Sequence, residues 1–265
     1  PPEYRVGGDE VEEALAGTLL RPVAHEDMQG DLHLHTDWSD GLDTVEDIVA
    51  EAARRGYSYV AVSDHTAYHV AAHGLSAERL LAQWEAIDRL QRRYPSIAIL
   101  EGAEVDILPD GTLDIADDVL RKADIVLASV HKHADVEPRM LTRRLIRAME
   151  NPHVDVLAHP TGRSVGKSDY RVDVEELLCA AARLGVALEI NCAPNRLDLD
   201  EESVRRCVDL GIALAIGSDA HSVGEMDQFS LGVGVAQRAR CTSHNILNAR
   251  SPRELRAWLD WHRNH

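Results

Sequence analysis

Seven short apolar runs alternate with helical stretches from residue 30 onward, and this alternation limits the fold more than any other feature of the chain. The runs predict strands at 31–35, 58–64, 97–106, 124–130, 154–159, 186–191 and 213–218. Helices are expected at 43–56, 76–95, 138–152, 173–185, 200–211 and 251–262. Strand–helix repeats build parallel sheets, and continuous apolar runs suit strands that are buried on both faces. The pattern predicts an α/β fold, and 265 residues suffice for one α/β barrel.

The chain is expected to contain one domain with a short segment before it. Residues 1–29 form this lead-in, with an acidic helix at 7–17 and a loop at 20–30. Residues 30–265 hold the whole strand–helix pattern and no internal repeat beyond it. We therefore expect a lead-in at 1–29 and a single domain at 30–265.

Composition restricts the compartment and the partners of the protein. The four cysteines are far apart and form no C-x-x-C pair, which argues against a zinc ribbon or a disulfide framework and favours a reducing cytoplasm. No run of 18 apolar residues and no signal-peptide pattern is present, so no membrane association is expected. The formal net charge of −17 disfavours tight DNA binding by this chain alone. Three divalent metal ions would reduce that charge to about −11.

Polar side chains gather where the predicted strands end. They are His33, His35 and Asp40 after the first strand, His65 after the second, Glu104 in the third, His131 after the fourth, His159 after the fifth, and Asp219 and His221 after the seventh. In α/β barrels the active site lies at the carboxyl ends of the strands, built from several of them. Strand six offers only Asn191 and no strong ligand. We expect the other six strands to direct their polar side chains into one pocket.

These residue types favour a site with several metal ions. A single histidine at a strand end is more often a hydrogen-bonded structural residue, but six histidines and three acids at one edge are costly to bury without metal. Imidazoles and carboxylates without thiolates suit Zn²⁺, Mn²⁺ or Fe²⁺. Nine ligands exceed the needs of one ion, and Glu104 is placed to bridge two. Clustered ions of this kind most often serve phosphate-ester hydrolysis.

The ordered motifs resemble those of the polymerase and histidinol phosphatase (PHP) superfamily. They are DLHLHTDWSDG, AVSDHT, GAEVDIL, ASVH, LAHPTG and GSDAHS, and the likeness extends from about residue 29 to the end. The segments LAHPTGR, EINCAPNRLDL and LGVGVAQRARCTSHNILN are most similar to the C-terminal PHP domain of bacterial family-X DNA polymerases. The resemblance implies a distorted (βα)7 barrel with a trinuclear metal site at the carboxyl ends of its strands.

The resemblance also implies a ligand set for each metal ion. His33, His35, Glu104 and Asp219 would hold the first ion and act in catalysis, Glu104, His131 and His159 the second, and Asp40, His65 and His221 the third. Every family position carries a competent ligand. Asp64 and Asp106 are expected either to orient bound imidazoles or to act as structural partners. The chain is thus expected to bind up to three divalent ions.

The implied activity is hydrolysis of phosphate esters by a metal-activated water, as 3′–5′ exonuclease or 3′-end processing of DNA. A polymerase domain in a longer chain would then supply much of the DNA affinity. One alternative is a stand-alone phosphatase for histidinol phosphate or a nucleotide monophosphate, which the acidic charge favours. Another is a non-catalytic module that binds metal only for stability.

Several residues beside the predicted ligands are candidates for contact with the substrate. Lys132 and Arg163 each lie just past a metal ligand and are potential phosphate contacts, although each is equally compatible with an exposed loop cation. The remaining candidates are Asn191, Asn195 and Arg196 after strand six, and His73 and His133 in loops.

Overall fold

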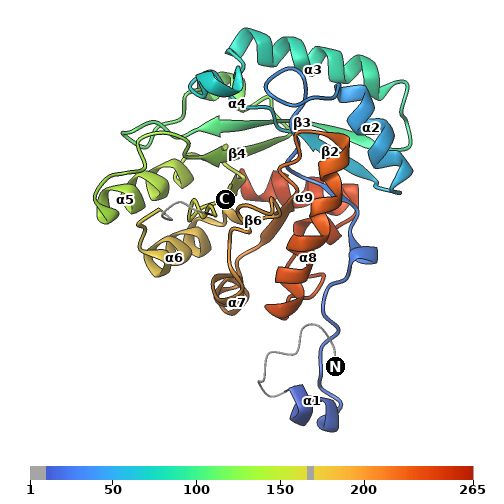
Figure 1. Ribbon diagram of the computed structural model, residues 1–265, viewed down its shortest axis with the longest axis vertical. Coiled ribbons are helices and arrows are strands. Elements are labelled where there is room, and N and C mark those ends of the chain that lie inside the picture. The colour runs from blue at the N-terminus through green and yellow to red at the C-terminus, as the bar shows by residue number, and fades with distance from the viewer. Residues whose placement is uncertain (1–9, 166–169, 265) are drawn as a thin grey trace.

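The computed structural model describes residues 10–165 and 170–264, which form seven strands surrounded by helices (Figure 1). The strands are β1 (Gly30–Asp31), β2 (Tyr59–Val62), β3 (Ala98–Asp106), β4 (Ile125–Ser129), β5 (Val156–Leu157), β6 (Ala187–Asn191) and β7 (Leu214–Gly217). The α-helices are α1 (Glu10–Ala16), α2 (Val45–Arg54), α3 (Ala77–Gln91), α4 (Asp117–Leu120), α5 (Pro138–Met149), α6 (Val174–Leu184), α7 (Glu201–Leu210), α8 (Phe229–Arg238) and α9 (Pro252–His262). Four 3₁₀ turns complete the description: η1 (His25–Asp27), η2 (Val70–Ala72), η3 (Val223–Gln228) and η4 (Leu247–Ala249).

The seven strands form one parallel sheet in the order of the sequence, β1 to β7. The segments that follow β1 and β7 also meet, through a parallel bridge between Leu34 and Ala220. There His35 N donates to Ala220 O over 2.9 Å, and Asp219 N donates to His33 O over 3.0 Å. The sheet is thereby nearly closed into a barrel, which confirms the predicted (βα)7 fold.

The first strand is shorter than its apolar pattern predicts. Residues 31–35 were expected to be extended throughout, but only Gly30 and Asp31 join the ladder with β2. The buried Asp31 carboxylate accepts hydrogen bonds from the backbone N–H groups of His33 and Ser218. Because this side chain takes up the backbone donors, the ladder ends there and the chain turns toward the seventh strand.

The helices begin where the sequence signals place them. Thr44 caps α2 in a capping box with Asp47, and Ser251 caps α9 in the same way with Glu254. Such residues satisfy the unpaired N–H groups at a helix start. The expected helices at 43–56, 76–95, 138–152, 173–185, 200–211 and 251–262 are all present, and the ends of most are trimmed by one to four residues.

Successive side chains along each strand alternate between the inside of the barrel and its outer surface, and the two sets pack differently. One face of each strand lies inside the barrel, where Ala61, Leu127 and Ala187 belong to a cluster that also includes Leu255 and Leu259 of α9. The outward residues pack against the surrounding helices in two further clusters, one around α2 and α3 and one around α5 to α8. The apolar filling of the barrel therefore ends below the polar residues at the strand tips.

Helix α8 has no counterpart among the helices expected from the sequence. Its segment contains Gly232 and Gly234, and glycine is a poor helix former. A Cβ at Gly232 would overlap Cys192 Sγ and lie 3.0 Å from Ile216 Cγ2. Tertiary contact explains the helix: glycine lets α8 pack directly against β6 and β7, and this packing compensates for its weak propensity.

The described part of the lead-in, residues 10–29, packs on the carboxyl-terminal part of the chain. Val23 N donates to Cys241 O and Gln29 N donates to Asn248 O, each over 2.7 Å. In Figure 1, α1 lies at the bottom of the view, below the barrel. Among residues 10–165 and 170–264, no helix is both long and apolar enough to cross a membrane.

Candidate metal centre

The structure brings the nine predicted metal ligands together at the carboxyl ends of the strands. They are His33, His35, Asp40, His65, Glu104, His131, His159, Asp219 and His221, supplied by β3 and by the segments after β1, β2, β4, β5 and β7. His33 and His35 direct their Nε2 atoms at the same oxygen, Glu104 Oε2, at 3.3 and 3.5 Å. The two imidazoles, two residues apart in the sequence, therefore point at the same atom. They do so although their segment lies beyond the β1 ladder and is not part of a strand.

Glu104 occupies the middle of the cluster, and each of its oxygens faces different imidazoles. Oε1 lies 2.8 Å from His159 Nε2 and 3.3 Å from His131 Nε2. Oε2 lies 2.9 Å from His65 Nδ1 and 3.3 Å from His33 Nε2. The side chain is fully buried because it points into the barrel from the inner face of β3. Such a carboxylate is placed to bridge two ions.

Two ligands follow their strands in a backbone conformation that few residues adopt. His159 has φ 30° and Asp219 has φ 54°. Positive φ is uncommon for residues with a side chain, and such residues are concentrated at functional sites. The turn places Asp219 Oδ1 3.1 Å from His35 Nε2 and 3.7 Å from His33 Nε2. Asp219 thus meets both histidines of the first strand.

A third group lies on the open side of the cluster. Asp40 Oδ1 is 3.4 Å from His221 Nε2 and 3.8 Å from His65 Nε2, and His35 completes the group. Burial lowers the pKa of His35 to about 3, aided by the charges of His65 and His221. Its imidazole therefore stays unprotonated. The side chains of Asp40 and His221 are 29% and 32% exposed, so solvent reaches the centre from here.

Charges within the cluster shift its protonation. Burial alone would raise the pKa of Glu104, but His65, His33 and His131 hold it well below the usual value. Burial alone would lower the pKa of His131, but Glu104 and Asp106 raise it to about 10. Without metal, a protonated His131 imidazole therefore lies beside a negative Glu104 carboxylate at neutral pH.

Two carboxylates behind the ligands have different roles, and one of them holds an imidazole in place. Asp106 Oδ1 lies 3.1 Å from His131 Nδ1, as expected for an orienting partner. Asp64 has the structural one of its two expected roles: it accepts hydrogen bonds from the Thr36 N–H at 2.8 Å and from the Thr36 and Ser39 hydroxyls. Asp64 therefore fixes the loop that carries Asp40 and contacts no imidazole among the described residues.

Glu189 is a buried partner that the sequence analysis did not identify. Its Oε1 lies 2.6 Å from His33 Nδ1, and its Oε2 accepts the backbone N–H of His159 at 2.8 Å. Asn191 joins it, donating from Nδ2 to Glu189 Oε2 and to Asp219 Oδ2, each over 3.1 Å. The signal was an acid inside an apolar strand, two residues before Asn191 and so on the same face.

His69 is a second residue that the sequence analysis overlooked. Its ring lies against those of His65 and His131, with ring centroids 4.6 and 4.2 Å apart. His69 lies in a loop, directly before η2. Because this loop has no regular periodicity, the sequence does not indicate where the His69 side chain points.

The polar atoms of the cluster fit metal ions. Glu104 Oε2, His33 Nε2, His65 Nδ1 and His131 Nε2 are buried and lack hydrogen-bond partners among the described residues. An unsatisfied buried polar atom costs about 1–3 kcal/mol, which a bound cation would offset. Groups of three or four potential ligand atoms lie within 4.8 Å of one another. Their imidazole nitrogens and carboxylate oxygens suit Zn²⁺, Mn²⁺ or Fe²⁺.

The predicted substrate contacts divide into two groups. Asn191 and Arg196 adjoin the centre, and Arg196 Nε lies 3.6 Å from Asp219 Oδ2. Lys132 instead donates to Tyr68 O over 2.5 Å, and Arg163 donates to Leu197 O over 3.2 Å.

The two loop histidines of the sequence analysis have other surroundings. His73 is exposed, and its backbone carbonyl accepts a hydrogen bond from Arg79. His133 is also exposed, and its carbonyl accepts from Arg144. The described contacts place neither side chain in the cluster.

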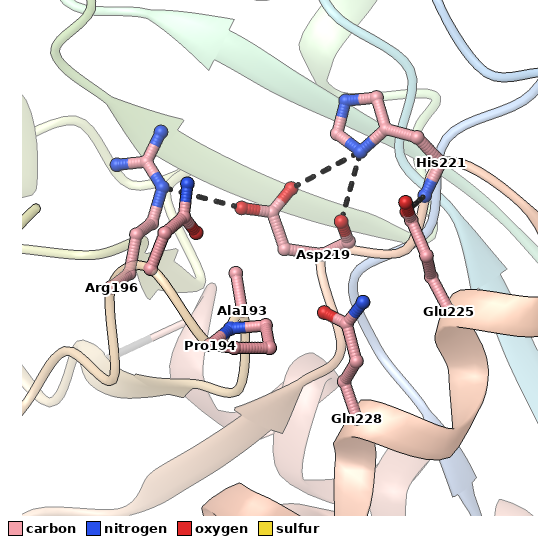
Figure 2. Close-up of a pocket in the computed structure, with 8 residues that line it drawn as sticks. Ala193, Pro194, Arg196, Asp219, His221, Glu225 and Gln228 are labelled. Carbon is pink, nitrogen blue, oxygen red and sulfur yellow. Dashed lines mark hydrogen bonds and ion pairs between the residues drawn. The ribbon is translucent and has the colours of Figure 1, made fainter. Parts of the chain in front are cut away.

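A pocket of about 450 Å³ adjoins the centre (Figure 2). Asp219 and His221 form its border with the cluster, and Figure 2 shows Arg196 and His221 on either side of Asp219, with Gln228 below it. Ala193, Pro194, Asn195 and Glu225 complete the lining. The pocket therefore offers a cation, amides and apolar surface beside the potential metal ligands.

Comparison with known proteins identifies the family. The PHP domain family matches residues 31–193, which is more than half of the chain. The chain belongs to the PHP domain family. This PHP domain is 40% identical over 260 residues to the DNA polymerase/3′-5′ exonuclease PolX of Bacillus subtilis, a match that covers 98% of the chain and 45% of PolX. The chain thus spans less than half the length of that relative.

Two further comparisons concern phosphatases. A protein of Syntrophotalea carbinolica named "Probable phosphatase" is 30% identical over 241 residues, covering 87% of this PHP domain and 94% of the relative. A structure of histidinol phosphate phosphatase from Lactococcus lactis, complexed with zinc, L-histidinol and phosphate, superposes with a TM-score of 0.55 at 18% identity. That match covers 78% of this chain and 94% of the other and supports the fold. Family membership marks this PHP domain as a metal-dependent hydrolase.

Proposed function

We propose that the centre around Glu104 binds up to three divalent ions and hydrolyses phosphate esters at the 3′ ends of DNA. The observation that carries the proposal is the bridging position of Glu104, whose Oε1 faces His131 and His159 while Oε2 faces His33 and His65. Bound divalent ions lower the pKa of a water molecule and stabilise the charge that develops on phosphate oxygens. The residues of the centre would hold these ions in position.

Each ion would have its own ligand set. His33, His35, Glu104 and Asp219 would hold the first, Glu104, His131 and His159 the second, and Asp40, His65 and His221 the third. Zinc in the Lactococcus lactis structure supports zinc as one occupant, and the same ligands accept Mn²⁺ or Fe²⁺. Asp106 and Glu189 would fix the orientation of His131 and His33 toward their ions.

The substrate would approach from the exposed side of the centre. Asp40 and His221 are partly open to solvent, whereas Glu104 is fully buried. The pocket beside Asp219 begins on this side, and Arg196 is placed there to contact a phosphate oxygen. Asn191 would keep the Asp219 carboxylate turned toward the first ion.

Similarity favours DNA ends as the substrate. The match to the Bacillus subtilis polymerase and exonuclease covers 98% of this chain at 40% identity. The net charge of −17 opposes strong binding to a polyanion by this domain alone. We therefore propose that a linked polymerase domain acts as its partner and supplies affinity for DNA.

A small-molecule phosphatase is the second candidate. The acidic charge favours it, and the phosphatase relative is matched over 94% of its length. Under this alternative, histidinol phosphate or a nucleotide monophosphate would occupy the pocket beside Asp219.

Hydrolysis of a substrate panel separates these functions. The purified chain would receive Mn²⁺ and one of four substrates: 3′-labelled single-stranded DNA, a 3′-phosphorylated oligonucleotide, histidinol phosphate or AMP. The proposal predicts the highest kcat/KM with a DNA end, and Asp219→Asn as the control should lose that activity while remaining folded. Preference for a small monoester would support the phosphatase instead. A folded, metal-loaded chain inactive on all four would indicate a structural module.

A further inference from the structure

A third imidazole lies against two of the proposed ligands without belonging to either set. The ring of His69 stacks on that of His65, with centroids 4.6 Å apart and planes inclined by 19°. It meets the ring of His131 edge-on, with centroids 4.2 Å apart and planes inclined by 72°. One nitrogen atom from each of the three rings lies within 4.8 Å of the other two. This cluster contains no carboxylate.

The backbone holds His69 firmly in this position. Its N–H donates to Thr66 O over 3.0 Å, and its carbonyl accepts from the N–H groups of Ala72 and Gly74 over 3.1 and 3.3 Å. The segment then returns to the barrel, where Leu75 N donates to His65 O over 2.7 Å. His69 therefore lies in a loop that is closed by the hydrogen bond between Leu75 and His65. Both its own backbone N–H and its own carbonyl form hydrogen bonds within this loop.

Neighbouring elements clamp the same loop from outside. Asp114 accepts hydrogen bonds from the Thr66 hydroxyl at 2.7 Å and from the Tyr68 N–H at 2.9 Å. Lys132 donates to the Tyr68 carbonyl from the segment after β4. These contacts fix Thr66 and Tyr68, which precede His69 in the loop. The fold therefore holds His69 close to the centre.

One nitrogen of His69 lacks a partner. Its Nδ1 atom is buried and forms no hydrogen bond within the described part of the chain. His65 Nδ1 and His131 Nε2 also form no hydrogen bond there, although they face Glu104 Oε2 at 2.9 Å and Glu104 Oε1 at 3.3 Å. A cation that accepted their lone pairs would relieve the cost of burying these unsatisfied nitrogens.

We propose that His69 is an additional zinc ligand and forms an all-imidazole position with His65 and His131. This inference rests on the proposed metal centre and adds a ligand to it. Three histidines form a ligand set that Zn²⁺ accepts readily, with a fourth position left open. Mn²⁺ favours sites with more carboxylate oxygens, which the other groups of the centre contain. The position at His69 is therefore selective for zinc over manganese.

Zinc at this position draws on ligands of the neighbouring ions. His65 also belongs to the group with Asp40 and His221, and His131 to the group with Glu104. A neutral imidazole has one free lone pair, so each ring binds one ion at a time. The chain consequently loads zinc and manganese in different patterns.

Metal titration of the full chain tests this inference. Metal-free wild type, His69→Leu and His69→Gln would be titrated with Zn²⁺ and with Mn²⁺ in a calorimeter, and Co²⁺ loading would be followed by visible absorption. The matched control is His73→Leu, because His73 lies in the same segment but is exposed and has no described side-chain contact with the centre. Thermal melts would verify that each variant is folded.

Both His69 variants should lose one zinc equivalent or weaken one zinc-binding step at least 10-fold, with an altered Co²⁺ spectrum. Mn²⁺ binding should stay within 2-fold of the wild type, and His73→Leu should match the wild type throughout. Unchanged zinc binding in both folded His69 variants would overturn the inference alone. A wild-type chain that binds no metal would overturn the metal centre itself, and the inference with it.

Discussion

Glu189 and Glu104 lie on opposite sides of the His33 imidazole. Glu189 Oε1 contacts Nδ1 at 2.6 Å, which leaves Nε2 directed at Glu104 and Asp219. A carboxylate behind a ligating histidine fixes the ring and increases its basicity, and its loss typically costs 10- to 100-fold in metal affinity. Glu189, which is outside the proposed ligand sets, thereby fixes the ring orientation of His33.

Glu189→Gln should therefore weaken the tightest metal-binding step by about 10- to 100-fold while the chain remains folded. The amide keeps the shape of the side chain but loses its charge. Calorimetric titration with Mn²⁺ measures the effect, and Glu175→Gln is the control because Glu175 pairs with Arg206 on an exposed helix face. Equal affinities in Glu189→Gln and wild type would show that Glu189 has no role in the centre.

Protonation at single residues leads to a pH prediction. In the metal-free chain the pKa of His131 is raised from 6.5 to about 10 and that of His221 to about 9. Both imidazoles are then protonated at pH 7, and an incoming ion must displace their protons. Metal affinity should rise as pH increases from 6 toward 9, and binding should release protons. Calorimetry in two buffers of different ionisation enthalpy measures the release; identical heats in both would contradict it.

At the level of secondary-structure elements, close packing between strands determines how precisely the side chains of the site are positioned. Gly217 ends β7, and a Cβ there would overlap Glu189 Oε1 and lie 2.6 Å from the Cβ of His33. The segment after β1 and strands β6 and β7 meet at this point. Any larger side chain would separate His33 from its carboxylate.

Gly217→Ala should thus lower metal affinity more than 10-fold and destabilise the fold by about 1–3 kcal/mol, as overpacking does. Gly224→Ala is the control, since the nearest atom to an added Cβ there is Ser222 Oγ at 3.9 Å. Urea unfolding and metal titration of both variants provide the comparison. A Gly217→Ala chain with unchanged affinity would contradict the packing argument.

Elements also show how far the sequence determines this structure. The alternation of apolar runs with helical stretches predicts all seven strands in order, and the strand ends predict which ligands converge. Glu189 was not predicted as part of the site because its strand was interpreted as a uniform apolar run. His69 was not predicted because contacts with distant residues such as Asp114 determine the shape of its loop. Helix α8 depends on contact of Gly232 with Cys192 and Ile216, which local propensity cannot express.

Metal binding should also matter for the molecule as a whole. The ions would reduce a net charge of −17 and satisfy buried nitrogens, yet the apolar clusters inside and outside the barrel do not involve the centre. A ligand at 100 times its Kd stabilises the folded state by about 2.7 kcal/mol per site. Removal of metal should therefore lower the melting temperature without unfolding the chain at 25 °C.

Scanning calorimetry with and without EDTA tests this expectation. The melting temperature should fall by several degrees in EDTA and recover when Zn²⁺ or Mn²⁺ is added in excess. An identical melting temperature in both states would show that the centre binds no ion strongly. Complete unfolding in EDTA would show instead that the core depends on the metal.

The most direct measurement compares Mn²⁺-dependent hydrolysis of a simple phosphodiester by the wild type and by Glu104→Gln. This variant keeps the size of the side chain and removes the bridging charge between the imidazole groups. We expect hydrolysis by the wild type and a loss of at least about 1,000-fold in kcat/KM, or about 4 kcal/mol, in a variant that is still folded. Activity of Glu104→Gln within 10-fold of the wild type would contradict the proposal that Glu104 bridges a catalytic metal centre.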